Sequence, residues 1–142
     1  MTTTALPIPH ATAPDVMPVH GIDHLELYVG NAAQAAYYYT RAFGFVQTAY
    51  RGLETGTRDR VSHVLAQGRI RLVLTGTLTG DDEIADHHRR HGDGVISIAL
   101  SVPDAAAAYE HAVGHGARGL QTPFELSDKH GTVRLASVAT YG

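Results

Sequence analysis

An internal repeat constrains the fold of this chain more than any other feature of its sequence. Residues 21–33 and 94–106 align at a constant offset of 73, with identical Gly, Leu, Val and Ala residues at matching positions. In each copy an apolar stretch ends at Gly or Pro, and Asn31 or Asp104 then supplies a side-chain oxygen that can cap an alanine-rich helix. Because such a repeat marks a duplicated supersecondary unit, we expect the same strand and helix to occur twice.

The remainder of each copy predicts further strands. Apolar residues spaced three and four apart predict helices over about residues 32–43 and 105–115, which end near Gly44 and Gly116. We therefore predict an α+β chain of two β-α-β-β-β modules whose curved sheets face each other, with the second module lacking its last strand. The strand-like stretches that follow the helices are 45–50, 61–66 and 70–75 in the first copy, and 119–126 and 132–140 in the second.

These elements define the expected domain organisation. Module one covers residues 21–76, a polar connector with a short helix over 81–91 covers residues 77–93, and the incomplete module two covers residues 94–142. Residues 1–20 hold four of the six prolines and predict a disordered N-terminal arm. This arm has neither the basic start nor the continuous apolar core of a secretory signal, so we expect a cytoplasmic location.

The composition excludes several classes of protein. The 142 residues include no cysteine, which excludes a disulfide scaffold and any thiolate-bound metal. Eleven Lys and Arg against 14 Asp and Glu leave a formal charge of −3, which argues against a nucleic-acid partner. No apolar run approaches the roughly 20 residues that a membrane-spanning helix requires. Ten histidines raise the question of a metal or acid–base site.

His24 is the first candidate for such a site. In modules of this kind a metal is held by residues on the first and last strands, and His24 and Ser97 occupy equivalent positions on the two first strands. The expected last strand of module one, residues 70–75, contains no His, Asp or Glu. At most one of three ligands is available, so we interpret His24 as a sheet histidine with a hydrogen-bonding partner.

A second group of histidines falls in the connector. The spacing of His87, His88 and His91 places two imidazoles on one face of a helix, as in zinc-binding helices. No Glu follows His87 as in the H-E-x-x-H motif, and Arg89 and Arg90 would repel a cation. We interpret this segment as a solvated connector helix.

Three further motifs have simple structural interpretations. Residues 114–119 match G-x-G-x-x-G but follow a helix rather than a strand, so the glycines predict a helix end and a turn. The consecutive tyrosines 37–39 point in different directions on a helix, so one is expected to pack and the others to reach the surface or a neighbouring subunit. A charged turn is interpreted as a set of loop-stabilising ion pairs, formed by Arg51, Glu54, Arg58 and Asp59.

An ordered set of short segments carries a family resemblance. From about residue 21 to the last residue, the chain resembles the N-terminal half of the 4-hydroxyphenylpyruvate dioxygenases, in the vicinal-oxygen-chelate or glyoxalase-like superfamily of β-α-β-β-β modules. It departs from the family at Leu53, where proline is common. The segments are 24–31 (HLELYVGN), 36–39 (AYYY), 42–44 (AFG), 49–52 (AYRG), 54–59 (ETGTRD), 91–95 (HGDGV) and 130–133 (HGTV).

The resemblance implies an Fe(II)-dependent 2-oxo acid dioxygenase of tyrosine catabolism, which converts 4-hydroxyphenylpyruvate and O₂ to homogentisate and CO₂. That chemistry needs two histidines and one carboxylate around an open iron. In the family these ligands belong to the C-terminal half. The resemblance therefore implies no catalytic, cofactor-binding or metal residue in this chain, a C-terminal catalytic half as its partner, and assembly as a homo-oligomer.

Other functions remain open at this point. The N-terminal half of a 4-hydroxymandelate synthase shares the substrate, the iron and the same pattern. A stand-alone module could hold a small ligand on its sheet without a metal, and a structural subunit could complete its sheet with another chain. We expect the chain alone to show no dioxygenase turnover.

The missing strand predicts how the isolated chain behaves. Residues 133–141 form an apolar final stretch, and an unpaired strand edge there would leave backbone donors and acceptors free to join another chain. We expect the purified chain to be oligomeric or marginally soluble. Light scattering checks this, and a stable dilute monomer would contradict it.

Overall fold

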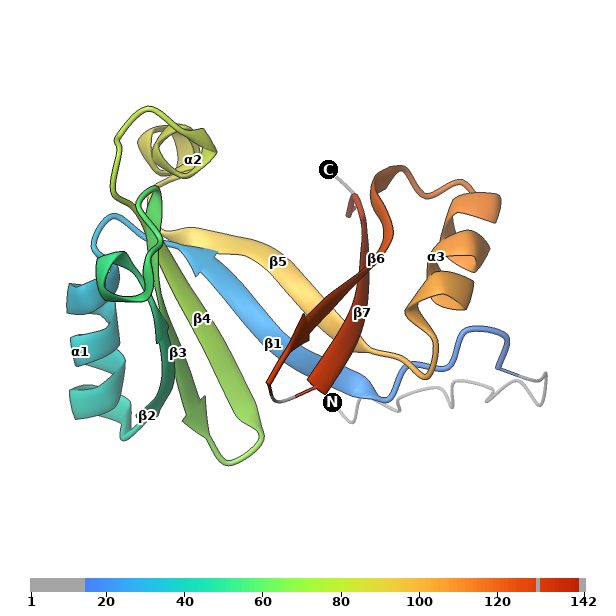
Figure 1. Ribbon diagram of the computed structural model, residues 1–142, viewed down its shortest axis with the longest axis horizontal. Coiled ribbons are helices and arrows are strands. Elements are labelled where there is room, and N and C mark those ends of the chain that lie inside the picture. Colours follow the sequence, from blue (N-terminus) through green and yellow to red (C-terminus); the bar gives the residue numbers. More distant parts are fainter. Residues whose placement is uncertain (1–14, 130, 141–142) are drawn as a thin grey trace, which may run out of the picture. The chain divides into compact units, whose positions relative to one another are not determined.

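The computed structural model describes residues 15–129 and 131–140, which form two compact units (Figure 1). One unit comprises residues 20–101, and the other comprises residues 102–140 together with residues 15–19. No helix of these described residues is long and apolar enough to cross a membrane. The elements in chain order are β1 (Gly21–Tyr28), α1 (Ala32–Phe43), β2 (Val46–Arg51), the 3₁₀ helix η1 (Leu53–Thr55), β3 (Arg60–Gln67), β4 (Ile70–Thr77), α2 (Glu83–His91), β5 (Gly94–Ser101), α3 (Ala105–Gly114), β6 (Gly119–Asp128) and β7 (Gly131–Val138).

Both helix starts in the repeat are confirmed at the atomic level. The Asn31 side chain accepts a hydrogen bond from the backbone N–H of Gln34 at 3.0 Å. Asp104 accepts from the backbone N–H groups of Ala106 and Ala107 at 2.9 and 3.2 Å. At the other end of α1, Gly44 adopts a left-handed conformation with φ 76°, which glycine reaches without steric cost. The sequence did not predict η1.

A five-stranded sheet in the order β2-β3-β4-β1-β5 forms the first unit. β4 runs parallel to β1. α1 follows β1 in the chain, packs against one face of the sheet and leads into β2. The other pairs in this sheet are antiparallel. The hydrophobic core lies between α1 and the sheet and consists of Val29, Ala32, Ala36, Phe45, Leu65, Leu72 and Leu74.

The first strand of the second repeat belongs to this same sheet. β5 pairs antiparallel with β1, whereas β6 and β7 form a separate two-stranded sheet. In the first repeat, β4 joins the first strand to the rest of the sheet, because it pairs with both β1 and β3. Two strands follow α3 in the described chain, as predicted, and neither of them pairs with β5.

The second unit has little core of its own. Its helix α3 contains no buried residue, whereas α1 buries Ala32 and Ala36 at the equivalent face. Several large apolar side chains of β6 and β7 are exposed, namely Leu120, Leu126, Val133 and Leu135.

Leu74 provides a test of the core. Its side chain is fully buried in β4, so Leu74→Ala removes packing that the neighbours cannot fully restore. We expect the free energy of unfolding to fall by about 2–5 kcal/mol, measured by urea denaturation. Leu53→Ala is the matched control because that leucine is exposed, and a similar loss in both variants would contradict the placement of the core.

Candidate functional site

His24 has the hydrogen-bonding partner that the sequence predicted. Its Nδ1 lies 2.8 Å from Oδ2 of Asp23, and Arg71 donates to the other oxygen of Asp23 at 2.8 Å. The hydrogen bond from His24, and then that from Arg71, hold the pKa of Asp23 below its usual value against the opposing effect of desolvation. The His24 ring is thus held by a residue of its own strand.

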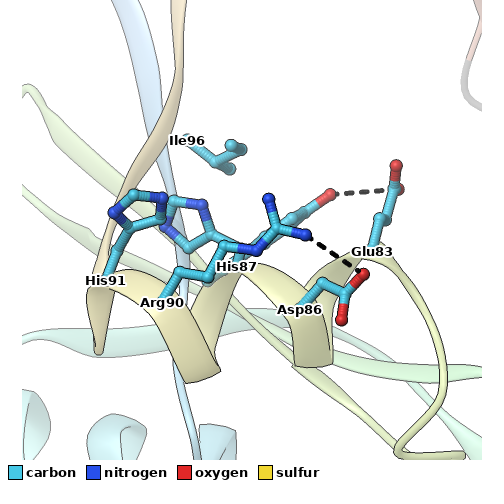
Figure 2. Close-up of a pocket in the computed structure, with 7 residues that line it drawn as sticks. Glu83, Asp86, His87, Arg90, His91 and Ile96 are labelled. Carbon is cyan, nitrogen blue, oxygen red and sulfur yellow. Dashed lines mark hydrogen bonds and ion pairs between the residues drawn. The ribbon is translucent and has the colours of Figure 1, made fainter.

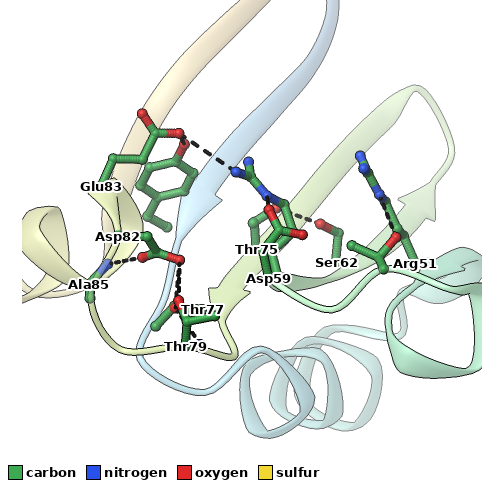
Figure 3. A network of polar contacts seen from close by, with 12 residues as sticks. Arg51, Asp59, Ser62, Thr75, Thr77, Thr79, Asp82, Glu83 and Ala85 are labelled. Carbon is green, nitrogen blue, oxygen red and sulfur yellow. Dashed lines mark hydrogen bonds and ion pairs between the residues drawn. The ribbon is translucent and has the colours of Figure 1, made fainter.

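The sheet face on the side away from α1 carries a polar column where β1 and β4 lie side by side. The Thr75 hydroxyl donates to Glu26 at 2.8 Å. The Ser62 hydroxyl lies 2.9 Å from the Thr75 hydroxyl (Figure 3). Thr75 is fully buried, so this column satisfies polar groups that would otherwise be costly to bury. The only carboxylate in the column is committed to a hydrogen bond within the sheet.

These residues do not fit a mononuclear iron centre of two histidines and one carboxylate. Across residues 15–129 and 131–140, no group of three or more His, Asp or Glu side chains lies close enough to hold a metal. His24 faces Asp23, and Ser97 supplies only a hydroxyl at the equivalent position of β5. No step of a metal-dependent reaction can be assigned to the described residues.

A cleft of about 340 Å³ opens between α2 and the ends of β1 and β5 (Figure 2). It is polar on the side of α2 and apolar on the side of β5. The sequence alone did not identify it, because it depends on packing α2 against two strands that are distant in the chain. Its lining residues are Tyr28, Glu83, Asp86, His87, Arg90, His91 and Ile96.

Tyr28 is the most strongly perturbed group in the cleft. Its side chain is buried, its hydroxyl donates to Glu83 at 3.3 Å, and its ring meets His87 edge-on at 5.6 Å between centroids. Burial, reinforced by the negative charges of Glu83 and Glu26, raises the pKa of Tyr28 to about 12. The phenol therefore stays neutral at physiological pH and serves as a hydrogen-bond donor.

The connector histidines divide into two roles. The rings of His87 and His91 lie side by side with centroids 4.9 Å apart, as their spacing predicted (Figure 2). His87 Nε2 is buried and has no hydrogen-bond partner among the residues that the structure describes. His88 points elsewhere and lies 3.0 Å from Asp93, which also accepts from the backbone N–H of Gly30 at 2.8 Å.

The interpretation of α2 as a solvated connector is wrong in one respect. Ile84 is fully buried and Ala85 is buried beside it, so the helix packs on the sheet through its first turn. Asp82 caps this turn by accepting from Ala85 at 2.9 Å and from Thr77 at 2.7 Å (Figure 3). The isolated apolar Ile84 in a polar segment was the available signal.

The charged turn is stabilised differently from the prediction. Arg51 donates to Thr57 at 3.0 Å, Glu54 accepts from Tyr50 at 2.5 Å, and Asp59 pairs with Arg60 at 2.9 Å. Among the described residues, no ion pair joins two of the four predicted partners Arg51, Glu54, Arg58 and Asp59. The charged side chains therefore do stabilise the loop, but their partners are Thr57, Tyr50 and Arg60, which the sequence analysis did not predict.

The other two motifs are confirmed. Tyr39 packs against the core while Tyr37 and Tyr38 are exposed. The α3 helix ends at Gly114, and the backbone N–H of Gly116 donates to the carbonyl of Val113 at 3.0 Å. The G-x-G-x-x-G pattern is therefore a helix end followed by a turn.

Tyr28 makes stability depend on alkaline pH. An unfolded tyrosine ionises near pH 10, whereas folded Tyr28 stays neutral to about pH 12, so rising pH favours the unfolded chain over this interval. We expect this loss to reach about 2 kcal/mol by pH 11.5 and to be absent in Tyr28→Phe. Urea unfolding between pH 9 and 11.5 checks the difference in slope. Tyr37→Phe is the control, because that side chain is exposed, and equal slopes in all three proteins would refute the assignment.

Comparison with known proteins places this fold. The chain is 47% identical to 4-hydroxyphenylpyruvate dioxygenase of Dictyostelium discoideum over 87% of its own length and 34% of the relative. It is 43% identical to the same enzyme of Xenopus tropicalis over 84% of the chain and 30% of the relative. The chain thus spans about a third of the length of these relatives.

Solved structures agree with this placement. A mutant 4-hydroxymandelate synthase from Streptomyces coelicolor superposes with a TM-score of 0.82 at 34% identity, over 88% of this chain and 36% of that one. Methylmalonyl-CoA epimerase from Mycobacterium tuberculosis shares the fold, with a TM-score of 0.66 at 18% identity over 92% of this chain and 95% of that one. The family model matches residues 21–134. The chain belongs to the Glyoxalase/Bleomycin resistance protein/Dioxygenase superfamily.

Proposed function

We propose that this chain is the N-terminal, non-catalytic half of a 4-hydroxyphenylpyruvate dioxygenase, which converts 4-hydroxyphenylpyruvate and O₂ to homogentisate and CO₂. The observation that carries the proposal is its 47% identity to the Dictyostelium enzyme over 87% of the chain, within only 34% of that enzyme. An identity this high along nearly the whole chain favours the same enzyme rather than a distant member of the superfamily.

The geometry of the sheet supports a structural role. Glu26, the only acid of the column formed with Thr75 and Ser62, is used inside the sheet, and His24 is paired with Asp23. We propose that the Fe(II) of the full-length enzyme is bound by residues of a C-terminal half, which is the partner of this chain. The complete enzyme is proposed to be cytoplasmic and to assemble as a homo-oligomer.

A 4-hydroxymandelate synthase is the second candidate. The superposition on the Streptomyces coelicolor enzyme, with a TM-score of 0.82, favours it. Both enzymes would use this chain in the same way, and the product would be decided by residues outside it. A metal-free ligand-binding module is the third candidate, and the cleft of about 340 Å³ is the observation that favours it.

A chimeric enzyme tests the leading proposal. We would join residues 1–142 to the portion of the Dictyostelium enzyme that the chain does not cover, and supply 4-hydroxyphenylpyruvate and Fe(II). We expect the chimera to form homogentisate and the chain alone to form none, because only the fused portion brings iron ligands. Chromatography of the products separates homogentisate from 4-hydroxymandelate.

Matched variants make the result specific. In the chimera, His24→Ala and Glu26→Gln should leave the iron content unchanged, since neither residue is proposed as a ligand. Homogentisate from the chain alone would overturn the proposal, as would a folded, iron-loaded chimera that yields no product. Loss of iron in either variant would place a ligand in this chain.

A further inference from the structure

The paired imidazoles of His87 and His91 have no part in the proposed reaction. They lie four residues apart on α2 and form part of the wall of the cleft of about 340 Å³ (Figure 2). All residues that line this cleft belong to the compact unit of residues 20–101. The arrangement of the two rings is therefore a property of one folded unit.

One nitrogen of this pair has an unmet need for a partner. Nε2 of His87 is buried and, among the described residues, has no hydrogen-bond partner. On the side of β5 it lies near Gly94, where an added Cβ would be 3.6 Å away. A buried polar atom without a partner is rare in folded proteins, because its lost contact with water is not replaced. The nitrogen is thus available to a bound ligand.

The separation of the two rings matches a metal chelate. Two histidines four residues apart on a helix can bind one metal ion between them. With each nitrogen about 1.2 Å from its ring centre, metal–nitrogen bonds of about 2.0–2.1 Å and an angle of about 90–110° at the metal place the ring centres about 4.5–5.2 Å apart. The rings of His87 and His91 are 4.9 Å apart. The similar pair on α3, His111 and His115, is at 4.2 Å, below this range.

The charges at the cleft also favour a cation. Two carboxylates, Glu83 and Asp86, line it together with one guanidinium, Arg90. Asp86 lies 2.6 Å from Arg89 and 3.8 Å from Arg90, so the two arginines that argued against a bound cation share a carboxylate. Arg60 approaches Glu83 at 3.9 Å but does not line the cleft. The histidine pair lies toward the C-terminal end of α2, where the helix dipole attracts positive charge.

We propose that His87 and His91 bind one divalent transition-metal ion, of which Zn²⁺ is the type, through Nε2 of His87 and a ring nitrogen of His91. Water completes the coordination, because no group of three or more His, Asp or Glu side chains in the described chain lies close enough to hold a metal. Imidazole suits Zn²⁺, Ni²⁺ and Cu²⁺, whereas Mg²⁺ and Ca²⁺ prefer oxygen ligands. This site is separate from the Fe(II) proposed for a C-terminal half.

The bound ion links successive turns at the end of α2. His87 also meets Tyr28 of β1 edge-on, so the ion fixes the helix end beside the ring that contacts the sheet. The unfolded chain has no such preformed pair, and a ligand that binds only the folded state stabilises it. We therefore expect Zn²⁺ to raise the temperature at which the chain unfolds.

Equilibrium dialysis of the purified chain against Zn²⁺ tests the site. We expect saturable binding that His87→Ala and His91→Ala each weaken at least tenfold, because each variant removes one of two protein ligands. His91→Ala carries the test even if His87→Ala loosens the contact with Tyr28, because the side chain of His91 is exposed. An excess of Mg²⁺ should not displace the Zn²⁺.

Two matched variants serve as controls. His88→Ala removes a histidine of the same helix that lies 3.0 Å from Asp93 and does not line the cleft. His111→Ala breaks the pair on α3, whose other member, His115, has its Nδ1 2.8 Å from the His111 carbonyl oxygen. Both variants should bind Zn²⁺ at the cleft as tightly as the unaltered chain.

Nitrogen-15 NMR of the histidine rings identifies the atom that binds. Zn²⁺ should shift the Nε2 resonance of His87 and leave the ring nitrogens of His88 unchanged. Absence of Zn²⁺ binding, or equal binding by the unaltered chain and both cleft variants, would overturn the proposal. Binding that is lost in His88→Ala or His111→Ala instead would place the ion elsewhere and would also overturn it. Binding at His87 and His91 would stand even if the chimeric enzyme formed no homogentisate.

Discussion

The structure depends on β1 pairing with a different strand along each edge. Along one edge, β1 pairs with β4 in a parallel orientation. This pairing places Leu72 and Leu74 of β4 in the core under α1. The other edge bonds antiparallel to β5, and this brings the second repeat into the sheet of the first. In the described chain β1 is the only strand that pairs with both β4 and β5, so substitutions along β1 would affect both the core and the joining of the two repeats.

The same pairing also assembles the polar column of Glu26, Thr75 and Ser62. A parallel neighbour places Thr75 within 2.8 Å of Glu26, and the antiparallel β3 adds Ser62 at 2.9 Å. The Thr75 hydroxyl, which is fully buried, thus has a partner on each side, Glu26 on β1 and Ser62 on β3. His24 contributes one ring nitrogen to its contact with Asp23, and among the described residues no group of three or more His, Asp or Glu side chains lies close enough to hold a metal.

The sequence predicted the local elements well because the signals for them are local. Asn31, Asp104 and Gly44 mark helix ends through interactions within a few residues, and the structure places the helix ends there. The sequence could not predict which edges meet. A repeat identifies equivalent units, but the choice of β5 to pair with β1 depends on which edges are left open after each unit has formed.

Contacts between distant residues were also beyond the sequence. Tyr28 meets Glu83, 55 positions further along the chain, only because α2 packs against the sheet through Ile84. In the charged turn, Tyr50 and Arg60 took the places that the sequence assigned to other charged residues. In both cases the sequence showed that polar residues were present, but which of them pair depends on how the folded backbone brings them together.

The two helices of the repeat show that burial is not a property of a local sequence. α1 and α3 begin with the same capping chemistry and the same pair of alanines, yet Ala32 is 2% exposed and α3 buries no residue. Ala32 is buried in the core between α1 and the sheet, where it lies close to Gly76 of β4. A duplicated segment therefore inherits its secondary structure from its own residues, whereas its stability comes from the strand that packs beside it. In this chain the second copy has retained the helix and its cap, but its described residues in α3 are not buried as Ala32 and Ala36 are in α1.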